Sequence, residues 1–276
     1  MRASARRIWG LMYRHLCLYR RSWPRLLELI YWPILQMCIW GFTASFITGQ
    51  AFAGHGLLHG NHRGLVLAAS TMLGGVLLWE VTIRSQMGVA ISFLEEIWSR
   101  NLGHIFISPL RPWELLAGLI GVAFARVLGG VLPAILVAYL LYAFNLFTLG
   151  PVLVLFFVNL MIMGWAFALA VVSLILRHGA GAEALAWSLL FGLTPLAAVY
   201  YPVTTLPVWL QPVSEAIPAT HVFEGMRAVL LNGHVSSTQL LAAFGLNAVW
   251  LVLASLLFAS QFRAARRRGA LITIGE

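Results

Sequence analysis

Long apolar stretches alternate with short polar ones along the whole chain. Six of these stretches are long enough to cross the hydrocarbon core of a bilayer, which takes about 20 residues of helix. They cover residues 26–48, 64–81, 112–144, 151–176, 185–201 and 240–262. The pattern predicts an all-α membrane protein with six transmembrane helices and one domain, residues 1–276.

An Arg-rich segment precedes the first span. Residues 1–25 hold seven arginines, of which Arg7, Arg14 and Arg21 repeat every seven residues, and apolar side chains recur at steps of three and four. This spacing predicts an amphipathic helix in the membrane interface, with a disordered positive tail as the alternative. The basic region is too long for a cleavable signal peptide, and the apolar stretch after it is long enough to span.

Two further segments interrupt the alternation of spans and short loops. Residues 92–108 follow the second span and combine an apolar face with charges, which fits a helix that docks in a groove of a soluble partner or lies on lipid. Residues 202–236 contain four prolines and a helical pattern too short to span. They predict short re-entrant or surface helices on the outer side.

The composition places the chain in lipid. Hydrophobic residues make up 61% of it and charged residues only 10%, whereas a soluble domain has about 25% charged residues. Too few polar side chains are present to coat a soluble core, and too many apolar ones for a disordered chain.

The charge distribution predicts the orientation. The formal net charge is +9, and every basic residue except histidine is an arginine. With both ends inside, fifteen arginines fall in cytoplasmic segments and two, Arg63 and Arg227, in outer ones. This asymmetry predicts a multi-pass protein of the bacterial inner membrane with both termini in the cytoplasm, and it argues against nucleic-acid binding.

Missing residue types exclude several chemistries. The chain has no Lys, so it has neither a Walker A phosphate loop nor a Schiff-base lysine, and it has no Asp for an aspartyl protease dyad. The two cysteines form no metal cluster. His55, His59 and His62 have zinc-like spacing, but the glycines among them disfavour a helix, and no metal site is expected.

Charged residues also occur at membrane depth. Arg126 lies within a predicted span, where a charge costs at least ~2.5 kcal/mol, so it should face the bundle or a wet cavity. Glu80 and Arg84 are four residues apart and suit an ion pair, as does Glu28 with a nearby arginine. Structural ion pairs are the favoured role of all four, with a substrate or proton path as the alternative.

Three amides lie within the spans as well. They suit hydrogen bonds between helices better than ligand contacts. They are Gln36, Asn159 and Asn247.

The whole chain resembles an ABC-2 type ABC transporter permease, of the group that exports polysaccharides, nodulation factors and drugs. Three features carry the resemblance: the Arg-rich N-terminus, EEIWSRNLGHIFISPLRPWELL after the second span, and YYPVTTLPVWLQPVSEAIPATHVFEGMRAVLLNG before the last span. Their order and spacing are more specific than any one of them.

The resemblance implies roles for two sets of residues. The segment after the second span would supply a coupling helix on the ATP-binding subunit, with Glu95, Glu96, Trp98, Arg100 and Asn101 at the contact. The segment before the last span would close the outer exit, with Pro207, Trp209, Glu224 and Arg227 in this external gate. Glu224 and Arg227 are spaced to pair across one helical turn.

The resemblance also implies an assembly. Two copies of the chain would enclose an export path and bind two ATP-binding subunits, which hold ATP and Mg²⁺, so this chain would be neither an enzyme nor a cofactor protein. The alternatives are an ion- or proton-coupled carrier that uses Arg126, Glu80 and Glu28, or an intramembrane lipid-modifying enzyme that uses the three histidines. Glycan, lipid, drug and peptide substrates all stay open.

Overall fold

The computed structural model describes residues 2–52, 62–101 and 110–267, and in these parts the regular secondary structure is helical. The long helices are α1 (Arg2–Arg21), α2 (Trp23–Phe52), α3 (His62–Trp98), α5 (Pro112–Tyr142), α6 (Val152–His178) and α10 (Ser237–Arg267). The short ones are η1 (Leu146–Leu149), η2 (Ala180–Ala182), α7 (Glu183–Leu196), η3 (Val203–Thr205), α8 (Gln211–Glu215) and α9 (Pro218–Asn232).

Five of the helices in these parts are long and apolar enough to cross a membrane, namely α2, α3, α5, α6 and α10. The predicted span 185–201 corresponds instead to α7, which has 14 residues and is therefore about 21 Å long at 1.5 Å per residue. The helix ends at Leu196, and the chain then turns at Ala198, whose φ is 54°. Alone, α7 is shorter than the roughly 30 Å hydrocarbon core.

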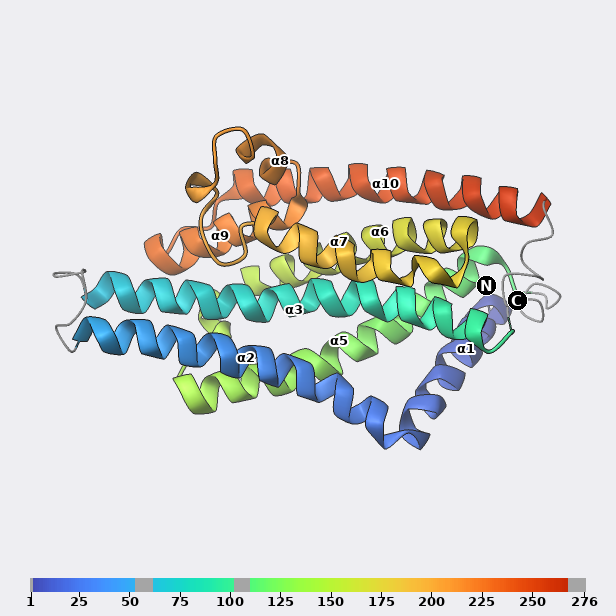
Figure 1. Cartoon of the computed structure of the whole chain (residues 1–276), viewed down its shortest axis with the longest axis horizontal. Coiled ribbons are helices and arrows are strands. Elements are labelled where there is room, and N and C mark those ends of the chain that lie inside the picture. The colour runs from blue at the N-terminus through green and yellow to red at the C-terminus, as the bar shows by residue number, and fades with distance from the viewer. Residues whose placement is uncertain (1, 53–61, 102–109, 268–276) are drawn as a thin grey trace.

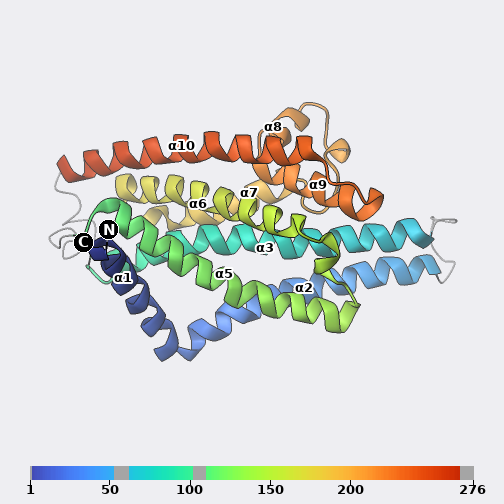
Figure 2. The same cartoon turned by 180° about the vertical axis from the view of Figure 1, so that it is seen from behind.

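The long helices form one bundle with α3 and α6 at its centre (Figures 1 and 2). α3 packs on both α5 and α6, while α10 lies along α6 and α2 lies against α3 and α5. Gly164 allows α6 to approach α3 closely, because a Cβ there would lie 2.9 Å from the Thr82 carbonyl oxygen. Asn247 of α10 donates to the Asn159 side-chain oxygen of α6 at 2.8 Å, which confirms the predicted hydrogen bond between spans.

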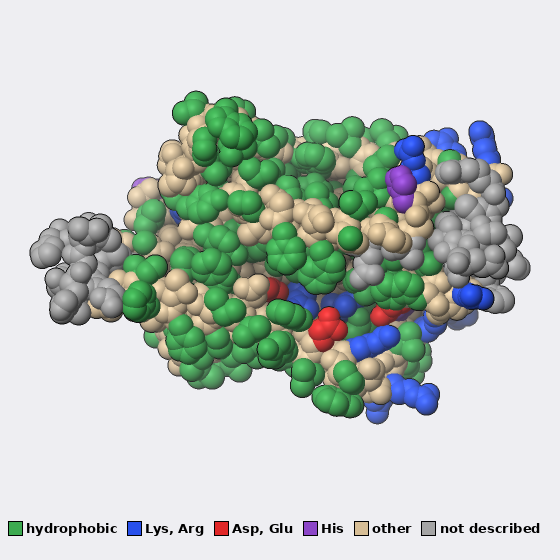
Figure 3. Space-filling view, viewed as in Figure 1, with side chains coloured by type: hydrophobic (Ala, Val, Ile, Leu, Met, Phe, Trp, Pro, Cys, Tyr) green, Lys and Arg blue, Asp and Glu red, His purple; other side chains and the backbone are tan. Residues whose placement is uncertain are grey.

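The start of α1 and the end of α10 lie at the same end of the bundle (Figure 1). Basic side chains gather at this end, whereas apolar side chains cover the middle of the molecule (Figure 3). We call it the arginine end, because it carries Arg6, Arg7, Arg266 and Arg267. α8 and α9 lie toward the opposite end (Figures 1 and 2).

α1 makes residues 2–21 of the predicted segment 1–25 helical, whereas α2 already begins at Trp23. α1 lies at an angle to α2 across the arginine end (Figure 1). Leu11, His15 and Tyr19 recur at four-residue steps and are buried against the bundle, whereas Trp9 and Tyr13 are exposed. The buried face of α1 packs chiefly on α5.

Candidate functional site

The candidate site is the junction at the arginine end where α1 meets the end of α3 and the start of α5. α3 continues without a break through the first part of the predicted coupling segment and ends at Trp98. A tight turn follows, with Arg100 at a φ of 53°. Asn101 closes the turn by donating from its side chain to Glu96 Oε2 at 2.7 Å. The rest of the predicted coupling segment, residues 102–108, lies outside the described residues.

Glu96 is fully buried beneath α1 and has a full set of partners there. Arg14 Nη1 lies 2.7 Å from Glu96 Oε1 and 2.8 Å from Oε2. His15 Nε2 lies 3.0 Å from the same Oε1. A buried carboxylate is tolerated only when it is paired and hydrogen-bonded, and α1 meets this need.

Glu95 makes a second connection to the N-terminal segment. Its Oε1 lies 3.0 Å from Arg25 Nη1, and its Oε2 lies 3.6 Å from His15 Nδ1. His15 is therefore buried between two carboxylates. Burial lowers the pKa of His15, but the adjacent Glu95 and Glu96 raise it more, so that its pKa lies above the ordinary value.

A third ion pair joins α1 to the start of α5. Arg7 donates from Nη2 to Glu114 Oε1 at 2.6 Å and from Nε to Oε2 at 2.9 Å. Glu114 Oε2 also accepts from the Arg111 backbone N–H at 2.9 Å, which caps α5. α1 thus holds both flanks of the connection between α3 and α5. Arg7 binds Glu114 through two nitrogens, the strongest geometry for such contacts, whereas Arg14 reaches both oxygens of Glu96 from one nitrogen.

Arg126 faces the bundle, as the sequence predicts, but it makes no ion pair with the described residues. Its guanidinium carbon lies 5.0 Å from the centre of the Tyr19 ring, and its Nη1 donates to the Gly88 carbonyl oxygen at 3.5 Å. The expected ion pair is therefore replaced by a cation–π contact, because Arg126 meets an aromatic face of α1. Glu28 is exposed and likewise has no ion-pair partner within the described parts, contrary to expectation.

The predicted coupling residues divide into two groups. Glu95 and Glu96 face α1, and Asn101 bonds Glu96, whereas Trp98 is 52% exposed and Arg100 is exposed. Among these five described residues, only Trp98 and Arg100 present free side chains at the arginine end. The contact with an ATPase stays a prediction.

The sequence analysis missed the partners on the other side of the junction. The heptad spacing of Arg7 and Arg14 indicated one helical face but not what it binds. Glu114 also had a signal, because it stands three residues after Arg111 and two after Pro112, as an N-terminal capping residue does.

At the opposite end, the predicted pair of Glu224 and Arg227 is confirmed at 3.1 Å. Glu224 Oε1 also accepts from the Val203 backbone N–H at 2.9 Å. Arg227 donates from Nη2 to the Ala198 carbonyl oxygen and, at 3.3 Å, to that of Val199. The pair therefore ties α9 to the turn after α7, while Pro207 and Trp209 are exposed nearby in sequence.

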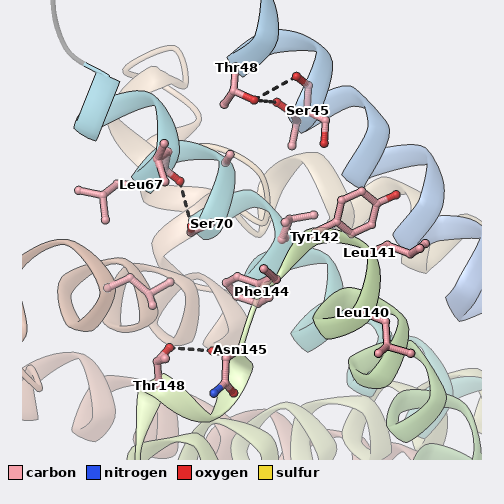
Figure 4. A pocket seen from close by; sticks show the side chains of 16 residues that line it. Ser45, Thr48, Leu67, Ser70, Leu140, Leu141, Tyr142, Phe144, Asn145 and Thr148 are labelled. Carbon is pink, nitrogen blue, oxygen red and sulfur yellow. Dashed lines mark hydrogen bonds between the residues drawn. The ribbon is translucent and has the colours of Figure 1, made fainter. Parts of the chain in front are cut away.

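A cavity of about 820 Å³ lies between the ends of α2, α3 and α5 (Figure 4). No charged side chain lines it. Most of its hydroxyl groups already donate to backbone carbonyls. Ser70 donates to Val66 at 2.9 Å and Thr148 to Asn145 at 2.8 Å, while Tyr142 of α5 donates to Cys38 of α2 at 3.3 Å. The described residues that line the cavity therefore offer few polar atoms with which to select a ligand.

The charged pair predicted in the second span is also present. Arg84 Nε donates to Glu80 Oε2 at 3.3 Å within α3. His55 and His59 lie outside the described residues, and the side chain of His62 does too, so the absence of a metal site stays a prediction.

Comparisons with known proteins agree with this architecture. The family model described as ABC-2 type transporter matches residues 6–231. The chain is 26% identical over 192 residues to the inner membrane transport permease YadH of Escherichia coli (strain K12), covering 64% of this chain and 68% of that relative. It is equally similar to the proteins of that name in Escherichia coli O157:H7 and Shigella flexneri. Because the family match spans most of the residues, including the junction and the Glu224–Arg227 pair, the chain belongs to the ABC-2 type transporter family.

Proposed function

We propose that this chain is the membrane-spanning subunit of an ATP-driven exporter, and that two copies enclose the path while separate subunits hydrolyse ATP. The arginine end would face the cytoplasm, because loops rich in arginine stay on that side. The observation that carries the proposal is the attachment of α1 to both flanks of the connection between α3 and α5.

The junction suits the transmission of force. α3 is one helix of 37 residues from His62 to Trp98, so a push on the turn at Trp98 moves the whole span rather than bending a loop. Arg7 and Arg14 make α1 and α5 follow the same movement. A soluble subunit that binds Trp98 and Arg100 would therefore act on three helices at once.

The proposal includes six crossings. α6 ends and α7 begins at the arginine end, whereas α10 begins toward the opposite end (Figure 1). The chain from α7 to α9 must therefore complete one crossing. α7 supplies the inner part, and α8 and α9 form a re-entrant outer segment fixed by Arg227.

Copurification tests the proposal. We expect a neighbouring gene to encode an ABC ATPase, and the tagged chain, expressed with that ATPase, should retain it on an affinity column. Trp98→Ala combined with Arg100→Ala should abolish the interaction, whereas Trp209→Ala, an exposed tryptophan at the opposite end, should not.

Two outcomes would overturn the proposal. One is failure of the chain to retain the ATPase, whereas retention that does not depend on Trp98 or Arg100 would only move the contact away from this turn. The other is transport by this chain alone in vesicles driven by a proton gradient, which would favour an ion-coupled carrier.

A further inference from the structure

A second cavity, of about 350 Å³, lies between α2, α3 and α7. Its size is at the lower end of the range for small-molecule sites. Its wall is aromatic with two polar groups, and the residues that matter are Gln36, Trp40, Trp79, Glu80, Trp187 and Tyr200. Neither the junction at the arginine end nor the Glu224–Arg227 pair includes any of them.

The aromatic rings are held in place by contacts with one another and with a neighbouring side chain. Trp40 and Tyr200 stack with centroids 4.3 Å apart at an interplanar angle of 24°. Trp79 Nε1 donates to Thr194 Oγ1 at 3.1 Å, which fixes the ring and uses its only donor. The rings therefore offer mainly π-faces, whose negative potential attracts cations.

Glu80 gives the cavity a partly unpaired carboxylate. The residue is 4% exposed. Its Oε2 accepts from Arg84, but no hydrogen bond from the described residues reaches its Oε1. Arg84 is absent from the lining of the cavity, whereas Glu80 belongs to it. Glu80 Oε1 is not one of the described buried side-chain atoms that lack a partner, so it is accessible from the cavity that Glu80 lines, and a cationic ligand can bind to it there.

The entrance to the cavity is apolar. Trp187 and Phe191 stack at 6.1 Å on α7, and both are exposed at the surface. A ligand that enters here passes its apolar part along these rings. The entrance thus favours an amphipathic molecule over a small hydrated ion.

From these observations we propose that the cavity binds an organic cation, a quaternary or tertiary ammonium group on an apolar body. The ammonium group lies against Trp40, Trp79 and Tyr200 with Glu80 as its counter-ion, and the apolar body lies against Trp187. The conclusion that organic cations are the exported cargo rests on the proposed export function, but the conclusion that the cavity binds them does not.

The position of Tyr200 supports a route outward. Tyr200 also lines a neighbouring cavity of about 510 Å³, together with Glu224 and Arg227. Tyr200 therefore lines both the cavity between α2, α3 and α7 and the one that contains the Glu224–Arg227 pair. A cation that leaves the first cavity past Tyr200 next meets the carboxylate of Glu224.

Equilibrium dialysis of the full chain in detergent micelles tests the proposal, with radiolabelled benzyltrimethylammonium as the probe. Choline and 3,3-dimethyl-1-butanol, which has the same shape without the charge, serve as competitors. Choline should displace the probe at a concentration about tenfold or more below that of the alcohol, because only the cation gains the interaction with the rings and the carboxylate.

Variants locate the site. Glu80→Gln and Trp187→Leu should each weaken probe binding about tenfold. Trp209→Leu, which removes an exposed tryptophan elsewhere, should leave it unchanged. Because Trp187 is at the surface, its variant tests the site even where loss of Glu80 perturbs folding, and gel filtration checks the fold of each.

Failure to bind the probe, equal competition by the alcohol, or binding that neither variant changes would overturn the proposal. Displacement by a neutral disaccharide alone would do so too, since it would identify a glycan site. Dialysis uses neither ATP nor a partner. A chain that binds the probe but retains no ATPase would refute the export function and support the binding site. A chain that retains the ATPase but does not bind the probe would support the export function and refute the binding site.

Discussion

Arg14 places one guanidinium nitrogen within 2.8 Å of both carboxylate oxygens of Glu96, across 82 positions of the sequence. The glutamate is fully buried and the arginine side chain is 40% exposed. The contact fastens the N-terminal helix to the cytoplasm-facing end of the second span in the proposed orientation.

Removal of Arg14 should therefore destabilise the protein. Arg14→Ala leaves Glu96 buried with His15 and Asn101 as its remaining partners. We expect a loss of about 1–2 kcal/mol, less than for a fully buried pair because Arg14 is partly solvated. The thermal unfolding midpoint in detergent measures it. Arg20→Ala, an exposed arginine of the same helix, should change little.

The attachment of α1 should weaken as the pH rises. Burial lowers the pKa of His15, but Glu95 and Glu96 raise it further, to above the ordinary value of about 6.5. Protonated His15 therefore stabilises the fold fully below about pH 6.5, and this contribution disappears as the pH rises through its raised pKa.

His15→Gln isolates this effect from other titrations. The facing charges are Glu95 and Glu96, with Arg14 and Arg25 bound to the same carboxylates. The difference in unfolding midpoint between the wild type and the variant should be largest at acidic pH and shrink above neutrality. A difference that stays constant from pH 5 to 9 would show that His15 does not bind its proton more tightly in the folded state.

The pair at the opposite end should require arginine specifically. Arg227→Leu leaves Glu224 without its cation and the Ala198 and Val199 carbonyls without their donor. The expected cost is about 2–3 kcal/mol. Arg227→Lys should restore little, because an ammonium group lacks the planar fork that reaches three acceptors. Arg177→Leu, on an exposed arginine, is the matched control in unfolding measurements.

Because α3 and α6 lie so close together, the addition of one methyl group at Gly164 should destabilise the protein. Gly164→Ala places a Cβ 2.9 Å from the Thr82 carbonyl oxygen and 3.1 Å from the Gln86 backbone nitrogen. The helices must separate, at a cost of about 1–3 kcal/mol. Gly192→Ala on α7 meets no atom within 4 Å and should be neutral or slightly stabilising. Equal unfolding midpoints for the two variants would contradict the close packing.

Local pairs were predictable from the sequence, whereas distant ones were not. Glu80 with Arg84, and Glu224 with Arg227, follow from helical spacing alone. Arg7 lies 107 positions from Glu114, and only the packing of α1 on α5 brings them together. For the same reason the sequence indicated that Arg126 faces the bundle but not that Tyr19 receives it.

The hydropathy pattern also could not predict where α7 ends. Residues 185–201 are mostly apolar and contain no charged residue, so their sequence predicts a span. The backbone leaves the helix after Leu196 because Ala198 adopts a left-handed conformation, which the carbonyl contacts of Arg227 support. An apolar composition indicates that a segment lies in lipid or among apolar side chains, but it does not indicate where its helix ends.

The attachment of α1 also sets an order for assembly during synthesis. Arg7 is made 107 residues before Glu114, and Arg14 is made 82 residues before Glu96. α1 thus leaves the ribosome well before the glutamates that bind its arginines. Until the end of α3 emerges, neither glutamate that binds Arg7 or Arg14 has been made, so premature release of the chain before Glu96 would leave α1 on the membrane surface as an unattached amphipathic helix.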